Sequence, residues 1–353
     1  MSKSYHKQRD EAIIKRTRAI RADLPKFCDM FFVGIENRTS ALTRLNYAYD
    51  LRIFFDFVYN SILSLDASTF KVKDLEKLTA VDIEMYLSYL SSYSFGGRDY
   101  QCNAAAKSRK LATVRSFFAY YFERDMIISN VSAKVKMPKR HDKPIVRLES
   151  REIGQLINGV ETGAGLSKQQ INYHNKYHLR DTAIITLFLG TGIRISECVG
   201  LNKNDINFRD NSFLVTRKGG NQTILYFSND VAKALGEYAG WLQSQIEENT
   251  DFAAKITDQD AFFISAQGGR LSVRAVQELV KKYSRLVTPL KKISPHKLRS
   301  TFGTQAYRQT RDIYVVADLL GHRDVNTTKK HYAATDEEIR RSAARSIILK
   351  DDE

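Results

Sequence analysis

A basic, proline-containing break near the middle of the chain most constrains its fold. Residues 134–147 read KVKMPKRHDKPIVR, with two prolines, six basic residues and one acidic residue, and they follow neither a helical nor a strand period. Proline lacks a backbone N–H and restricts the residue before it, so no regular element is expected to run through this segment. We therefore predict two domains, residues 1–143, which include this basic linker, and residues 144–353.

The first domain carries the apolar periodicity of α-helices. A cap cluster at residues 37–40 precedes apolar side chains spaced three and four apart, which predicts a long helix. Thr79 with Asp82 is typical of a capping box at the start of another helix. Residues 1–21 show a weaker version of the same pattern, and residues 101–123 predict a helix with an apolar core stripe and basic residues mostly off that stripe. We expect this domain to be helical.

The second domain mixes helices with one hairpin. Residues 213–217 and 222–227 alternate in the manner of strands around the turn KGGN, which places Lys218 at the tip of the hairpin. The fold class predicted for the whole chain is mainly α with a small antiparallel β-sheet in this domain. The remaining predictions are helices at 150–158, 181–189, 231–247 and 273–287, a polar loop up to residue 177, and a strand at 261–264.

The charge balance indicates a polyanionic partner. Lys and Arg number 55 against 40 Asp and Glu, a formal net charge of +15. A basic surface of this size attracts nucleic acid by steering and by releasing counterions from the phosphates. Charge alone leaves open a basic protein with no role on nucleic acid.

Other classes are disfavoured. A membrane helix needs roughly 20 apolar residues, and the longest largely apolar run, residues 183–189, is far shorter. The N-terminus is polar where a signal peptide would be apolar, so a cytoplasmic protein is expected. Cys28, Cys102 and Cys198 are odd in number and far apart, which argues against a disulfide framework and a zinc site.

The chemistry is expected to lie in residues 294–332. Ser294 followed by Pro295 predicts a helix start, and on that helix His296 and Arg299 are three residues apart and share a face. The guanidinium fork matches phosphate oxygens, and imidazole can move a proton near neutral pH. Further on, Gly321 is expected to end a helix.

The joint order of several short motifs resembles that of the tyrosine recombinases. The family pattern is an arginine in TGxRxxE, a hairpin lysine, HxxR, a histidine or tryptophan after LG, and a tyrosine nucleophile. This sequence has TGIRISE at 191–197, RKGG at 217–220, HKLR at 296–299 and LGH at 320–322. The matching catalytic residues are Arg194, Lys218, His296, Arg299, His322 and Tyr332, with Glu197 in support.

The resemblance implies how this set acts on DNA. Arg194 and Arg299 would bind the nonbridging oxygens of a phosphodiester, with a hydrogen bond from His322 and with Glu197 as an orienting group. Tyr332 would then attack the phosphorus. His296 would be its base and Lys218 the acid that protonates the departing 5′-oxygen. The reaction needs no cofactor, and the sequence has neither a Walker-type loop nor a carboxylate cluster for two-metal nuclease chemistry.

The resemblance covers both domains. The first looks like the helical, SAM-like core-binding domain, so a C-shaped two-domain DNA clamp is implied. The partners would be double-stranded DNA with paired inverted half-sites and further copies of the chain, a dimer on each site and a tetramer in synapsis. A C-terminal helix exchanged between protomers would join them. The residues expected to contact DNA are Arg44, Lys107, Arg109, Lys110, Arg115, Lys139, Arg140 and Lys143.

Within this family, the size and the N-terminal lead are similar to the single-protein Xer recombinases of Firmicutes, which implies resolution of chromosome dimers. An integrase or transposase of a phage or conjugative transposon is the alternative. A type IB topoisomerase and a DNA-binding protein with a degenerate site are two further hypotheses for the function. The sequence departs from the family at Ser300, where many members have a histidine, and in a spacing between His322 and Tyr332 that is one residue longer than in the most compact members.

Overall fold

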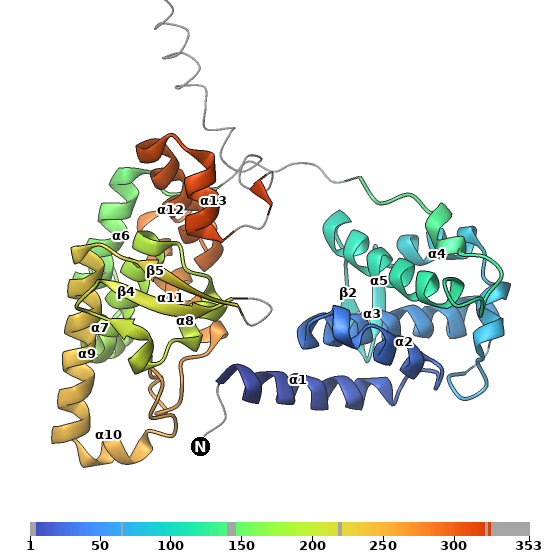
Figure 1. Ribbon diagram of the computed structural model, residues 1–353, viewed down its shortest axis with the longest axis horizontal. Coiled ribbons are helices and arrows are strands. Elements are labelled where there is room, and N and C mark those ends of the chain that lie inside the picture. The colour runs from blue at the N-terminus through green and yellow to red at the C-terminus, as the bar shows by residue number, and fades with distance from the viewer. Residues whose placement is uncertain (1–4, 65, 140–145, 218–220, 322–323, 326–353) are drawn as a thin grey trace, which may run out of the picture. The chain divides into compact units, whose positions relative to one another are not determined.

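The computed structural model describes residues 5–64, 66–139, 146–217, 221–321 and 324–325. The chain forms two compact units, Met1–Lys143 and Pro144–Glu353. Helices dominate both units, and within the described residues each unit has one small antiparallel sheet (Figure 1). The predicted fold class, mainly α with a small antiparallel sheet in the second unit, is confirmed.

The first unit consists of helices and one short hairpin. Its elements are α1 (Tyr5–Arg21), α2 (Cys28–Gly34), η1 (Glu36–Arg38), α3 (Ala41–Val58), η2 (Tyr59–Leu63), η3 (Val72–Lys77), α4 (Ala80–Tyr89), β1 (Tyr93–Phe95), β2 (Arg98–Tyr100), α5 (Ala104–Phe122) and η4 (Val131–Lys134). α3 contacts both α1 and α5. The unit is therefore organised around α3.

An aromatic cluster between α3 and α5 forms the centre of this core. Phe54 and Phe55 of α3 and Phe117 and Phe118 of α5 are at most 1% exposed. The rings of Phe55 and Phe117 meet edge to face with centroids 5.7 Å apart. Such a pair stabilises a fold by about 0.5–1.5 kcal/mol beyond the burial of its area.

Two predicted helix starts in this unit are confirmed. The hydroxyl of Ser40 accepts a hydrogen bond from the N–H of Thr43 at 3.2 Å at the start of α3. At the start of α4, the N–H of Asp82 donates to Thr79 Oγ1 at 3.3 Å and the N–H of Thr79 donates to Asp82 Oδ2 at 2.7 Å. Local capping chemistry therefore sets both boundaries.

The hairpin β1–β2 was not expected from the sequence. Tyr93 pairs with Tyr100 and Phe95 with Arg98 around a two-glycine turn. Gly96 and Gly97 have φ angles of 56° and 72°. A two-residue hairpin loop of type I′ needs positive φ at both positions, which glycine adopts without strain.

The second unit is organised around one long helix, α7 (Lys168–Thr191). Its elements are α6 (Ser150–Thr162), α7 (Lys168–Thr191), α8 (Ile195–Gly200), η5 (Lys203–Asp205), β3 (Ile206–Asn207), β4 (Ser212–Thr216), β5 (Gln222–Tyr226), α9 (Asn229–Glu248), α10 (Thr250–Lys255), α11 (Val273–Val287), α12 (Pro295–Thr310) and α13 (Ile313–Leu320). α7 contacts α6, α9, α11 and α12 (Figure 1). Its second half is almost entirely buried.

The predicted hairpin of the second unit is confirmed as β4–β5. The two strands are antiparallel with Phe213 opposite Leu225 and Thr216 opposite Gln222, and β3 adds a third strand at the other edge of β4. β4 contacts α8, the helix that follows the TGIR motif. The β4–β5 hairpin therefore packs next to the helix that follows the TGIR motif.

Two predictions for this unit are wrong. Residues 159–177 were expected to be a polar loop, but α6 runs to Thr162 and α7 begins at Lys168, because Ser167 and Gln170 form a capping box there. Residues 261–264 were expected to be a strand. They form only isolated bridges at Ala261 and Ile264, because their backbone groups bond to loops instead of to a neighbouring strand.

Candidate active site

The TGIR motif forms a fixed turn between α7 and α8. α7 ends at Thr191, whose hydroxyl donates to the carbonyl of Leu187 at 2.7 Å. Gly192 follows with φ of 60°, and a Cβ atom there would overlap the ring of Phe302. Glycine is therefore required both for the left-handed backbone and for the close packing, and Arg194 follows as the N-cap residue of α8.

Arg194 is held by a buried carboxylate. Its Nη1 donates to Glu197 Oε1 at 2.9 Å, and its backbone N–H donates to Glu197 Oε2 at 2.9 Å. The side chain of Glu197 is only 3% exposed, whereas that of Arg194 is 35% exposed. Nη2 of Arg194 donates to the carbonyl of Gly321 at 2.8 Å. The guanidinium is therefore oriented on one side and accessible on another.

Arg299 of α12 reaches the same backbone segment. Its Nη2 donates to the carbonyl of Leu320 and its Nη1 to the carbonyl of Gly192. The residue is 6% exposed. Leu320 and Gly321 end α13, where the helix dipole is negative and unpaired carbonyls accept from cations. Arg194 and Arg299 thus converge on consecutive carbonyls.

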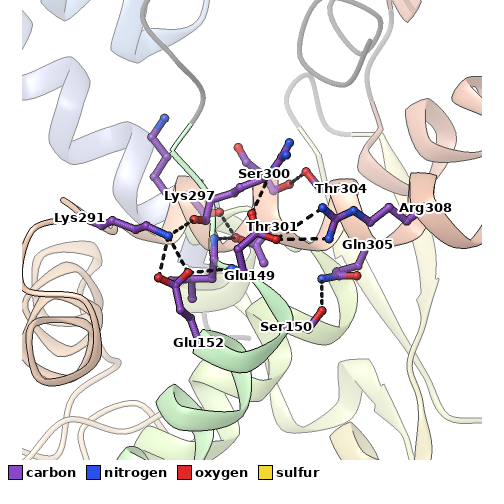
Figure 2. A network of polar contacts seen from close by, with 12 residues as sticks. Glu149, Ser150, Glu152, Lys291, Lys297, Ser300, Thr301, Thr304, Gln305 and Arg308 are labelled. Carbon is purple, nitrogen blue, oxygen red and sulfur yellow. Dashed lines mark hydrogen bonds and ion pairs between the residues drawn. The ribbon is translucent and has the colours of Figure 1, made fainter. Parts of the chain in front are cut away.

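A polar network joins α12 and the loop before it to α6 and the residues just before α6 (Figure 2). The hydroxyl of Thr301 accepts a hydrogen bond from the N–H of Leu148 at 3.0 Å. Lys291 Nζ lies 2.6 Å from Glu152 Oε2 in the first turn of α6. These bonds join residues about 140–150 positions apart in the sequence.

The predicted start of α12 is confirmed, with one difference. Ser294 is the N-cap and Pro295 the first helical residue, but the hydroxyl of Ser294 makes no capping hydrogen bond in the described residues. Proline at the first position lacks an N–H, so one fewer orphan donor needs a cap. His296 lies in the first turn and is exposed, unlike Arg299 one turn later. An exposed imidazole is accessible to a substrate.

Three members of the predicted set, Lys218, His322 and Tyr332, lie outside the described residues. The structure does describe the residues on either side of 218–220 and the one before His322. The N–H of Arg217 donates to the carbonyl of Asn221 at 2.7 Å and closes the base of the β4–β5 loop. Gly321, which ends α13 as predicted, has φ of 59°.

Arg217 is a residue that the sequence reasoning did not single out. A Cβ atom on Gly321 would overlap the guanidinium of Arg217, so this side chain lies directly against the Gly321 backbone. Its place next to Arg194 and Arg299 could not be read from one sequence, because it depends on how the hairpin packs. The only local signal is its position immediately before Lys218 in the RKGG motif.

In the first unit, two predicted DNA contacts belong to an ion cluster. Asp50 of α3 is fully buried and accepts from Lys110 Nζ at 2.9 Å, from Arg109, and from the hydroxyl of Thr113 at 2.9 Å. Lys110 is 5% exposed and its ammonium is bound to the Asp50 carboxylate, so in this structure its charge is neutralised within the unit, where it joins α5 to α3. The side chain of Arg109 is 51% exposed and can still reach DNA.

Two other predicted contacts are engaged with backbone carbonyls. Arg115 donates to the carbonyls of Ser132, at 3.2 Å, and Val135, and so ties α5 to η4 and to the residue that follows it. Arg44 donates to the carbonyls of Glu36 and Thr39 at 2.9 and 2.6 Å. Both guanidiniums therefore stabilise local structure.

Of the four remaining predicted DNA contacts, the structure describes Lys107 and Lys139. Lys107 Nζ donates to the hydroxyl of Ser91 at 2.6 Å. Lys139 is exposed. Arg140 and Lys143 lie outside the described residues. Lys139 is thus the member of this group most open to a phosphate backbone.

Cys198, next to Glu197, is not suited to be a nucleophile. Burial raises the pKa of the Cys198 thiol, and the adjacent Glu197 carboxylate raises it further, so the reactive thiolate is not formed near neutral pH.

Within the described residues, no group of three or more His, Cys, Asp or Glu side chains is placed to hold a metal ion. No helix in the described part of the chain is long and apolar enough to cross a membrane.

Comparison with known proteins identifies the family. The phage integrase family matches residues 147–338. Tyrosine recombinase XerC of Caldanaerobacter subterraneus subsp. tengcongensis is 31% identical over 314 residues, 86% of this chain and 81% of that protein. Tyrosine recombinase XerC of Staphylococcus saprophyticus is 28% identical over 313 residues, 88% of this chain and 93% of that protein.

Solved structures share the fold. XerH recombinase bound to the palindromic difH substrate matches with a TM-score of 0.64 and 18% identity over 88% of this chain and 81% of that one. A λ integrase tetramer bound to a Holliday junction matches with a TM-score of 0.59 and 15% identity over 87% of this chain and 76% of that one. The chain therefore belongs to the phage integrase family and is a Xer-like tyrosine site-specific recombinase.

Proposed function

We propose that this recombinase cuts and rejoins DNA through a 3′-phosphotyrosyl intermediate on Tyr332, acting as a DNA strand transferase. The observation that carries the proposal is the convergence of Arg194 and Arg299 on consecutive carbonyls at the end of α13, directly before His322 in the sequence. Both arginines also stand in the family motifs TGxRxxE and HxxR. Two cationic donors held in place before substrate arrives are what a phosphoryl transition state needs.

The arginines address the charge that builds on phosphate during attack. On DNA binding, Arg194 and Arg299 donate to the nonbridging oxygens, and His322 adds a hydrogen bond to the same oxygens. One preorganised donor of this kind contributes about 3 kcal/mol to transition-state stabilisation. Glu197 keeps the Arg194 guanidinium in orientation through two hydrogen bonds.

The remaining groups move protons. The phenol oxygen of Tyr332 forms a bond to phosphorus while its proton passes to His296, and the bond from phosphorus to the 5′-oxygen breaks as Lys218 protonates that oxygen. The phosphotyrosyl bond retains the energy of the phosphodiester. A 5′-hydroxyl from another strand can therefore reverse the step without ATP and without a cofactor.

A covalent capture experiment tests this function. Purified protein is mixed with fragmented DNA of the source organism and denatured in SDS, and protein-linked fragments are sequenced. We expect the fragments to share two inverted half-sites, to resist a 3′-exonuclease and to carry free 5′-hydroxyls that a kinase can label. Linkage to 5′ ends, or the absence of any adduct, would contradict the proposal.

Lys218→Ala is expected to slow adduct formation by about 10²-fold or more on a normal phosphodiester, since a positioned acid contributes about 10²–10⁴. A substrate with sulfur as the bridging 5′ atom should restore the rate, because a thiolate leaves without a proton. Adduct yield against time on both substrates is the measurement. Lys203→Ala, on an exposed lysine of η5, serves as the matched control. Equal defects on both substrates would remove the role of acid from Lys218.

We further propose that the biological role is resolution of chromosome dimers in the cytoplasm, by analogy with the XerC proteins that this chain resembles. Integration of a phage or conjugative transposon is the alternative. The captured sequence separates them, because a dimer-resolution site is a single chromosomal locus whereas an integrase is captured at the ends of an element. Relaxation of plasmid without any site by monomer would instead favour a type IB topoisomerase.

We propose that two protomers bind the inverted half-sites and that four form the synapse, joined through the C-terminal helix. A λ integrase tetramer on a Holliday junction has a similar fold, which supports the proposal. The segment after residue 335 lies outside the described residues. Its apolar residues Ile339, Ala343 and Ile347 fall at i, i+4 and i+8, so on a helix they form one stripe that needs burial.

Ending the chain after Thr335 is expected to leave half-site affinity within about threefold while cooperative binding and synapsis are lost, because the apolar stripe would dock on a neighbouring protomer. Gel-shift titrations with one and two half-sites measure this. If the stripe packs within its own unit, truncation would instead lower the melting temperature of the monomer and leave cooperativity unchanged.

A further inference from the structure

The guanidinium of Arg217 lies at the same point as the two proposed phosphate donors. Arg194 donates to the carbonyl of Gly321, Arg299 donates to the carbonyl of Leu320, and Arg217 covers the face of Gly321 where a side chain would project. Three guanidiniums therefore surround the backbone of two consecutive residues.

Arg217 differs from the other two in having an unmet donor. Its Nε is buried and has no hydrogen-bond partner among the described residues. No ion pair of this side chain is formed within the described part of the chain, whereas Arg194 is paired with Glu197. A buried charged donor without an acceptor is unfavourable, and its natural partner is an anion.

The position of Arg217 is fixed by the hairpin. It follows the last pair of β4–β5, Thr216 opposite Gln222, and its N–H donates to the carbonyl of Asn221 at 2.7 Å. The absence of a side chain on Gly321 leaves room for the guanidinium. The guanidinium of Arg217 therefore lies against the backbone segment to which Arg194 and Arg299 donate.

We propose that Arg217 is a third guanidinium of the phosphate site and donates to a nonbridging oxygen of the scissile phosphate when DNA binds. This inference rests on the proposed function. Its role is separate from that of Lys218, which acts on the bridging 5′-oxygen. The phosphate supplies an anion for a guanidinium that has no ion pair in the described part of the chain, and it lies among like charges that otherwise repel one another.

A charge-deletion experiment tests it. Suicide substrates that carry the captured half-site are made with a phosphodiester or an uncharged methylphosphonate at the scissile position. On the phosphodiester, Arg217→Ala should form the tyrosyl adduct about 10²-fold more slowly than the natural protein, as for loss of one preorganised donor. On the methylphosphonate, which removes the charge that Arg217 would neutralise, the two proteins should agree within about threefold.

Two controls accompany the comparison. Arg209→Ala, on an exposed arginine between β3 and β4, should match the natural protein on both substrates. Arg217→Lys should lie between the natural protein and Arg217→Ala, because lysine keeps the charge without the fork. The melting temperature of Arg217→Ala should be unchanged or higher, since a buried donor without a partner is removed.

The outcomes are distinct. An equal defect of Arg217→Ala on both substrates together with a lower melting temperature would show that the side chain only packs the hairpin on Gly321, and the inference would be wrong. If Arg217→Ala regained its rate only when the methylphosphonate replaced a neighbouring phosphate, the assignment to the scissile phosphate would be overturned. Adduct formation by the natural protein with no defect in Arg217→Ala also rejects it, while leaving the proposed function intact. Absence of adduct from the natural protein rejects both.

Discussion

Phenylalanine in place of Tyr332 is expected to abolish the covalent protein–DNA adduct and leave binding to the half-site unchanged. The substitution removes only the phenol oxygen, which is the atom proposed to bond to phosphorus, and keeps the ring and its volume. No other group is expected to substitute, because the Cys198 thiol of the same unit is buried with a raised pKa. Suicide substrates measure the adduct, and gel-shift titration measures the affinity.

A matched control is available on α13. Tyr314 is 71% exposed, so Tyr314→Phe removes a phenol from the same unit without touching the core and should form adduct at the natural rate. An adduct in Tyr332→Phe would mean that another residue is the nucleophile. Loss of both adduct and half-site binding would mean that Tyr332 supports the fold or the interface instead.

The sequence predicted those parts of the fold that depend on neighbouring residues. Ser40, Thr79 with Asp82, and Ser294 with Pro295 each mark a helix start in the structure, because a cap or a proline acts within one turn. The β4–β5 hairpin was predicted for the same reason, since alternation and turn residues are local signals.

The errors arise where tertiary packing overrides a local pattern. Residues 168–177 are polar and were expected to be a loop, but they extend α7, whose second half is buried among four other helices. Helical stability here comes from the packed end of the helix and from its capping box. Residues 261–264 have the composition of a strand without a neighbour to pair with along their length.

The candidate site shows the same division. The proposed catalytic residues were predicted from the order of their motifs, but the partners of the basic residues could not be predicted, because those partners lie far away in sequence. Lys110 and Asp50 are 60 positions apart, so a stripe of basic residues looked solvated when one member was paired in the core. The contact of Arg217 with Gly321 is likewise set by packing between a hairpin and a helix end.

Arg299 is expected to have both a structural and a chemical role, so its removal should affect two measurements. The buried guanidinium joins the end of α7, through the carbonyl of Gly192, to the end of α13, through that of Leu320. Arg299→Ala leaves both carbonyls without this donor, and we expect the free energy of unfolding to fall by roughly 2–6 kcal/mol, at 1–3 kcal/mol for each of the two unsatisfied buried groups.

The chemical effect of the same variant should be separable from the loss of stability. Below its melting temperature, Arg299→Ala is expected to form the tyrosyl adduct about 10²–10³-fold more slowly, as for loss of one preorganised donor to the transition state. Arg308→Ala is the control on the same helix, because its pair with Glu149, at 3.4 Å, is partly exposed and such pairs contribute about 0–1 kcal/mol. A methylphosphonate at the scissile position should recover much of the rate of Arg299→Ala but none of its stability, since only the rate depends on phosphate charge. Lost stability with an unchanged rate in the folded fraction would confine Arg299 to holding the helix ends together.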